Sequence, residues 1–282
     1  MNWSRPGPFR LRPELQRTAV ALAEAVGLGA MDASRLRLFG PGIAALDAIL
    51  AVVLAPSCAA CDEPLLHPTR GPVCDACWRS ILPLTPPLCD RCGDPLPTWR
   101  LVSIPLACCP RCRRARRLID RARAVGAYDG ALRAIIHALK YEGRRSLARP
   151  LGRLMRERGA DMLAGATCVV PVPLHPSRRR HRGFNQAADL ARHMGMPVRP
   201  ALRRVRATPT QTGLPAGRRH RNVRDAFAAT RAARPLTGAV VVLIDDVSTT
   251  GATLEACARA LKQAGVVEVR ALTAARVVTS PR

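Results

Sequence analysis

The feature that most constrains the fold is an apolar run that ends in two carboxylates. Residues 240–254 read VVVLIDDVSTTGATL. The β-branched and apolar residues are too few to span a membrane and indicate a buried strand, and the Ser, Thr and Gly residues after the acids indicate a loop that leads into a helix. Open α/β sheets bind their ligands at the carboxyl ends of such strands. We therefore expect an α/β protein with a ligand site at residues 245–253.

The acids and the loop suit a phosphorylated sugar. Asp245 and Asp246 are adjacent on an extended segment, so one side chain can face a sugar while the other faces a metal ion or backbone. Small residues let backbone N–H groups approach a phosphate, and the next helix directs its positive end there. The alternative is an ordinary buried strand before a capped helix, but two unpartnered acids are costly. The candidate phosphate-binding residues are Val247, Ser248, Thr249, Thr250, Gly251, Ala252 and Thr253.

This stretch resembles the signature of the type I phosphoribosyltransferases, which is four hydrophobic residues, two acids, a short variable segment and a Thr-Gly-x-Thr ending. The resemblance implies that Asp245 and Asp246 hold the ribose hydroxyls of phosphoribosyl pyrophosphate (PRPP) and that residues 248–253 hold its 5-phosphate. Thr249 stands where purine-specific members carry a third acid. This departure counts against chemistry on a purine base.

The spacing of the cysteines predicts a second structural element. Of 11 cysteines, most fall in four Cys-x-x-Cys pairs, which are typical of tetrahedral thiolate zinc sites and predict a double zinc ribbon. Disulfides are the alternative; they require an oxidising compartment, and Glu24 interrupts the only candidate signal-peptide region. Sequential and interleaved sharing of the zinc ions both fit the spacing. The candidate ligands are Cys58, Cys61, Cys74, Cys77, Cys89, Cys92, Cys109 and Cys112.

Charge and hydropathy restrict the partners and the location. The formal net charge of +25 attracts polyanions, although an Arg-rich composition by itself gives such a charge, and 3% aromatic residues leave few platforms for base stacking. Residues 43–55 are apolar at helical spacing, but they are too short to cross a membrane and include Asp47. We expect a cytoplasmic protein without membrane insertion, in which this helix docks on the zinc module through its apolar face.

The pattern divides the chain into four parts. We expect an amino-terminal extension at 1–40 with a possible helix at 13–26, a docking helix at 41–55, a double zinc ribbon at 56–118 and a phosphoribosyltransferase-like domain at 119–282. An alternative start at Met31 would leave the first thirty residues without function. In the last part, strands alternate with helices, which predicts a mainly parallel, doubly wound sheet with helices on both faces. The predicted strands are 121–128, 167–172, 197–205, 225–230, 239–244 and 266–277, and the helices are 130–141, 147–163, 186–194 and 251–264.

Two further segments contribute candidate residues. A Pro-bounded loop after strand 167–172 precedes the arginine string 178–182, which suits a diphosphate. By resemblance Leu174, His175 and Arg178 hold the pyrophosphate leaving group, although His175 could simply bind backbone. The basic segment at 208–227 is either a solvated loop or a lid. By resemblance it closes over PRPP, with Gln211, Arg221 and Asn222 folding in and with Gln211 and Arg221 joining the two acids in catalysis.

The order of these motifs resembles the ComF family over residues 42–278. The motifs are the cysteine pairs, Leu139-Lys140-Tyr141, VPVPLH with RGFNQ, TPxQ with RxNV, and the paired acids. The resemblance implies a link to natural competence, structural zinc, Lys140 as a ligand-binding residue, and Mg²⁺-dependent phosphoribosyl transfer from PRPP to an unidentified acceptor. A rival hypothesis is a non-catalytic module that senses PRPP or binds single-stranded DNA. A third is that the ribbons only cap the fold or dock a partner such as a competence helicase.

Overall fold

The computed structural model describes residues 33–96, 107–114, 117–206 and 225–278. The chain forms two compact units, Met1–Asp75 and Ala76–Arg282, and each is described by itself. The predicted helix at 13–26 and the predicted lid residues Gln211, Arg221 and Asn222 lie outside the described residues. None of the described helices is both long enough and apolar enough to cross a membrane.

The first unit is built on α2 (Ala33–Leu54), which contacts the short helix η1 (Pro68–Arg70). The contact was predicted to use an apolar helix face, but the residue that anchors it is Asp47. This carboxylate is buried, accepts a hydrogen bond from the Thr69 backbone N–H at 2.9 Å and lies 3.3 Å from Nδ1 of His67. Val52 remains 83% exposed. A hydrogen-bonded acid therefore fixes α2, because a buried carboxylate must find donors.

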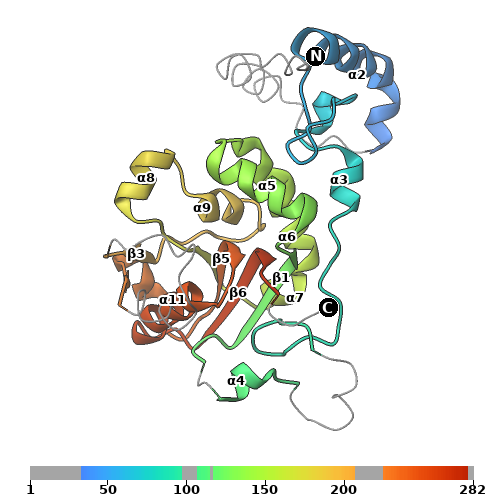
Figure 1. Ribbon diagram of the computed structural model, residues 1–282. Coiled ribbons are helices and arrows are strands. Elements are labelled where there is room, and N and C mark those ends of the chain that lie inside the picture. The colour runs from blue at the N-terminus through green and yellow to red at the C-terminus, as the bar shows by residue number, and fades with distance from the viewer. Residues whose placement is uncertain (1–32, 97–106, 115–116, 207–224, 279–282) are drawn as a thin grey trace, which may run out of the picture. The chain divides into compact units, whose positions relative to one another are not determined.

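The second unit contains a four-stranded parallel sheet, which confirms the predicted α/β class (Figure 1). The strand order is β1-β6-β5-β2, and β3 and β4 form a separate antiparallel pair. The strands are β1 (Arg121–Ala127), β2 (Cys168–Pro171), β3 (Leu202–Arg204), β4 (Phe227–Ala229), β5 (Val240–Ser248) and β6 (Glu268–Arg276).

Helices occur at most of the predicted positions, with two differences. The expected helix at 147–163 is broken at Gly159, and the arginine string after Pro176, for which no element was predicted, forms α8. Proline at the first helical position and His175, which accepts from the Ser177 N–H at 3.3 Å, explain this helix start. The helices are α3 (Asp75–Arg79), α4 (Pro110–Arg114), α5 (Gly130–Tyr141), η3 (Arg145–Leu147), α6 (Ala148–Arg158), α7 (Ala160–Leu163), α8 (Pro176–Arg182), α9 (Gln186–Ala191), η4 (Arg231–Leu236) and α11 (Ala252–Gln263).

The core lies on both faces of the central strand β5. Val241 and Leu243 are fully buried in a cluster with Cys257 and Leu261 of α11. Side chains alternate along a strand, so Val242 and Ile244 face the opposite side, where α9 contacts β5. The hydrophobic run 240–244 is buried on both faces, as expected for a central parallel strand.

Strand β5 is longer than predicted. It was expected to end at residue 244, but pairing with β6 continues through Asp245 opposite Thr273 and Ser248 opposite Arg276. The two acids therefore belong to the strand itself. Because side chains alternate along a strand, the two carboxylates point to opposite faces of the sheet.

We predict that Val241→Ala lowers the free energy of unfolding by about 2–3 kcal/mol, because it removes two methyl groups from the fully buried core. The matched variant Val267→Ala changes a side chain that is 64% exposed and is expected to cost less than about 0.5 kcal/mol. Urea unfolding of both variants measures the difference. Equal losses would contradict the assigned core.

Candidate functional site

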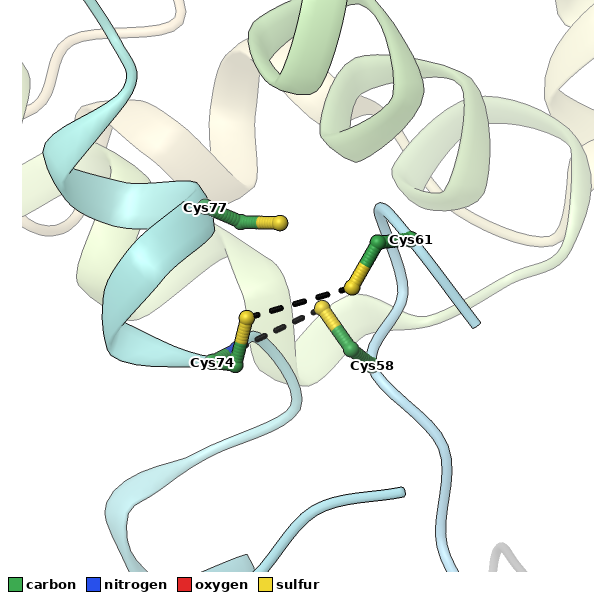
Figure 2. Close-up of side chains that lie close together, drawn as sticks. All are labelled: Cys58, Cys61, Cys74 and Cys77. Atoms are coloured by element: carbon green, nitrogen blue, oxygen red, sulfur yellow. Dashed lines mark hydrogen bonds between the residues drawn. The ribbon is translucent and has the colours of Figure 1, made fainter. Parts of the chain in front are cut away.

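The first four cysteines of the pattern converge on one point. The sulfur atoms of Cys58, Cys61, Cys74 and Cys77 all lie within 4.8 Å of one another and point toward a common centre (Figure 2). Cys61 Sγ is 3.9 Å from Cys74 Sγ, and the Cys74 backbone N–H donates to Cys58 Sγ at 3.3 Å. Four thiolates at this spacing fit a tetrahedral zinc ion.

The last four cysteines form an equivalent cluster inside the second unit. The sulfur atoms of Cys89, Cys92, Cys109 and Cys112 again lie within 4.8 Å of one another, with Cys92 Sγ 3.7 Å from Cys109 Sγ. The first and second Cys-x-x-Cys pairs therefore share one site and the third and fourth share the other, so the two sites are sequential and not interleaved. All described cysteines are free of disulfides.

The paired acids are both held by neighbours. Asp246 is 8% exposed, and its Oδ1 lies 2.8 Å from Nζ of Lys140 in the last turn of α5. Asp245 points to the α11 face of the sheet and accepts a hydrogen bond from the Asp246 N–H at 2.9 Å. Lys140 was predicted to bind ligand. The structure shows that its ammonium group holds Asp246, so the lysine supports the acid pair from one side.

Burial and the neighbouring carboxylate change the protonation of this group. Burial, reinforced by the charge of Asp246, raises the pKa of Asp245 to about 7. Burial opposes the charged form of Lys140, but the Asp246 carboxylate outweighs it and raises the pKa of the lysine. Two acids thus share one buried cation, and the raised pKa of Asp245 reflects this arrangement.

The loop after β5 presents two different sides. Ser248 and Thr250 are buried, whereas Thr249 and Thr253 are partly exposed. Gly251 has a φ of 77°, a left-handed conformation that favours glycine, and it provides no capping side chain for α11. The Thr250 hydroxyl accepts only a long bond from the Ala252 N–H at 3.4 Å. The first turn of α11 therefore keeps N–H groups suited to an anion.

In the predicted pyrophosphate loop, His175 has a local structural role. Its Nδ1 lies 2.7 Å from the Ser177 hydroxyl and caps α8, which is the local backbone role left open by the sequence. Leu174 and Arg178 are partly buried next to it. The acids, Lys140 and the loop residues come together at the carboxyl end of the sheet.

Arg204 is a neighbour of the site that the sequence did not predict. It lies on β3, and its guanidinium carbon is 5.3 Å from the centre of the Phe227 ring. Burial, followed by the charge of Arg178, lowers the pKa of Arg204, while Asp245 opposes that effect. The strand is only three residues long, and no motif marks it. Its proximity to Asp245 arises from tertiary packing alone.

Comparison with known proteins identifies the family. The Double zinc ribbon domain matches residues 49–115, and the Phosphoribosyl transferase domain matches residues 180–280. Competence protein F of Haemophilus influenzae is 30% identical over 75% of this chain and 93% of its own length. The chain belongs to the ComF family. Within that family, DNA utilization protein YhgH of Salmonella typhimurium is 33% identical over 76% of this chain and 93% of its own.

A more distant relative, Competence protein ComFC of Bacillus subtilis, is 26% identical over 71% of this chain and 82% of its own length. These matches confirm the expected double zinc ribbon followed by a phosphoribosyltransferase-like domain. The double-ribbon match and the two cysteine clusters together support structural zinc in this ComF protein.

We predict that the purified ComF protein holds two zinc ions per chain, because each cluster supplies four thiolates. Cys58→Ser with Cys61→Ser is expected to remove one ion, as measured by elemental mass spectrometry. The matched variant Cys108→Ser, next to the second cluster but outside it, should retain both. Retention of two ions in the double variant would refute the assignment of the first site.

Proposed function

We propose that this ComF protein binds PRPP at the carboxyl end of its parallel sheet and transfers the phosphoribosyl group to an acceptor that is not identified. The observation that carries the proposal is the order of the functional groups along β5 and into α11. Two carboxylates on β5 lead directly into a glycine turn and into the N-terminus of α11. One end of this arrangement suits hydroxyl groups and the other suits a phosphate.

The acids supply the sugar end of the proposed site. An ionised carboxylate only accepts hydrogen bonds, so Asp245 and Asp246 suit the two ribose hydroxyls. Lys140 orients Asp246 through the 2.8 Å ion pair. The ion pair gives the buried Asp246 carboxylate a partner and fixes its position in the proposed site.

The loop supplies the phosphate end. N–H groups of residues 249–253, together with the hydroxyls of Thr249 and Thr253, would hold the 5-phosphate at the positive end of α11. The net charge of +25 steers such an anion toward the protein. Lys140 and Arg178, with Leu174 and His175 beside them, would lie on the pyrophosphate side.

In the proposed reaction, the bond from the anomeric carbon to pyrophosphate breaks as the acceptor forms its bond to that carbon. Pyrophosphate leaves with the electron pair. Mg²⁺, when bound with PRPP, would neutralise the diphosphate charge, using mostly substrate and water oxygens. The chain's own part is to position the sugar and to stabilise charge, with Gln211, Arg221 and Asn222 proposed to close over the site.

A second candidate is a non-catalytic module that binds PRPP or single-stranded DNA. The exposed guanidinium groups of Arg179 and Arg180 on α8 favour a phosphate-bearing partner. Release of pyrophosphate from PRPP in a screen of acceptors would identify the enzyme. Salt-sensitive DNA binding without turnover would identify the module, and a helicase partner would require a separate binding assay.

We predict that Asp245→Asn with Asp246→Asn weakens PRPP binding by at least about 100-fold, because two charge-assisted hydrogen bonds of roughly 1.5–3 kcal/mol each are lost. Calorimetry with Mg²⁺ measures the affinity, and circular dichroism checks folding. The double variant Asp161→Asn with Asp225→Asn changes two exposed acids and should bind normally. The single variant Asp245→Asn keeps the ion pair between Lys140 and Asp246, so it provides a second test if the double variant does not fold. Unchanged binding would overturn the proposal.

We also predict that PRPP affinity rises about tenfold from pH 6 to pH 8, because the acid whose pKa is raised to about 7 must be ionised to accept the sugar hydroxyls. Its raised pKa keeps Asp245 protonated below that value, so binding weakens as the pH falls. In Asp245→Asn only the titration of PRPP itself should remain. A variant slope equal to the wild-type slope would exclude Asp245 as the titrating group.

A further inference from the structure

The two zinc ribbons are built alike. In the first, the Cys58 N–H donates to the Glu63 carbonyl at 2.8 Å, and in the second the Cys89 N–H donates to the Asp94 carbonyl at 2.8 Å. Isolated bridges pair Ser57 with Pro64 and Leu88 with Pro95. Glu63 and Asp94 are therefore equivalent positions in a repeated turn.

The ribbons differ at the residue before these acids. Asp62 in the first ribbon has a φ of 60°, and Gly93 in the second has a φ of 70°. At Gly93 a Cβ atom would lie 2.6 Å from the carbonyl oxygen of Ala122 on β1. Ala122 also donates its N–H to the Arg91 carbonyl at 2.8 Å. The second ribbon thus packs directly on the edge strand of the sheet, and only glycine permits this approach.

A buried ion pair joins the second ribbon to the far end of the sheet. Asp94 Oδ1 accepts from Nε of Arg276 at 3.0 Å, and the two side chains are 5% and 4% exposed. Arg276 is the last residue of β6 and lies opposite Ser248 of β5. The Val277 N–H donates to the Ser248 carbonyl at 2.9 Å. Asp94 and Arg276 therefore connect the second zinc ribbon to Ser248, at the start of the proposed phosphate loop.

Arg276 and Ser248 also line one crevice. Its walls are formed by Cys92 and Arg111 of the ribbon, by Arg276, and by Ser248 and Thr250 of the loop. Neither acid of the proposed sugar site belongs to this lining, so the crevice is distinct from the surroundings of the two carboxylates. A zinc ion with four thiolates carries net negative charge, and Arg111 and Arg276 are the cations that interact with Cys92.

We propose that the second zinc site, acting through Asp94 and Arg276, holds residues 248–251 in the conformation that binds the phosphate. Asp94 and Arg276 are positioning residues. Zinc at Cys89, Cys92, Cys109 and Cys112 fixes the turn that carries Asp94, and the ion pair transmits this order to Ser248. The inference rests on the proposed PRPP site. Glu63, at the equivalent position of the first ribbon, is exposed.

The test compares Asp94→Asn with its matched control Glu63→Gln. Amide hydrogen exchange of residues 248–254 is measured without ligand, and PRPP affinity is measured by calorimetry. In Asp94→Asn we expect loop exchange to rise and affinity to fall by roughly 3- to 30-fold, while the protein keeps both zinc ions. Glu63→Gln should change neither quantity. Wild-type loop exchange in Asp94→Asn would overturn the inference.

A second pair separates positioning from folding. Arg276→Lys keeps the cation and should restore most of the loop protection that Arg276→Met loses. Equal exchange in both variants would also overturn the inference. Failure of the wild-type protein to bind PRPP would refute the proposed function alone, because the exchange measurement tests the link between ribbon and loop without any ligand.

Discussion

The arrangement of the site depends on the electrostatics of two adjacent acids at the end of a buried strand. Parallel pairing with β6 continues past the apolar run and carries both carboxylates into the sheet. Alternation then separates them, with Asp246 facing Lys140 and Asp245 facing α11. A single buried cation serves two acids, and burial raises the pKa of Asp245. A titratable acid with a raised pKa at the carboxyl end of a parallel sheet favours a functional role over a purely structural one.

The second zinc ribbon is part of the same unit as this site. The second ribbon covers the edge strand β1 and contacts the end of β6 through the buried Asp94–Arg276 ion pair. It therefore contributes to the stability of the sheet in addition to holding its own metal. In the first unit, the corresponding charged anchor is Asp47, which fixes α2 to the segment beside η1. Both a double zinc ribbon and a phosphoribosyl transferase domain match this chain, and its relatives include proteins named for competence and DNA utilization.

Local sequence patterns predicted the elements that local chemistry controls. The apolar face of α5, its cap at Asp129, the parallel strands and the two cysteine clusters are all present. The errors arose where tertiary pairing overrides local signals. Ladder pairing with β6 extended β5 beyond its apolar residues. Arg204 and the Asp94–Arg276 pair join residues distant in sequence, so no spacing in the chain could predict them.

The most direct test of the account is a crystal structure of the protein with Mg²⁺ and PRPP. We expect both ribose hydroxyls within hydrogen-bond distance of Asp245 and Asp246, the 5-phosphate on the N–H groups of residues 249–253, and Lys140 still in contact with Asp246. The account would be contradicted by a structure in which PRPP occupies another surface while the two carboxylates and the loop remain without ligand.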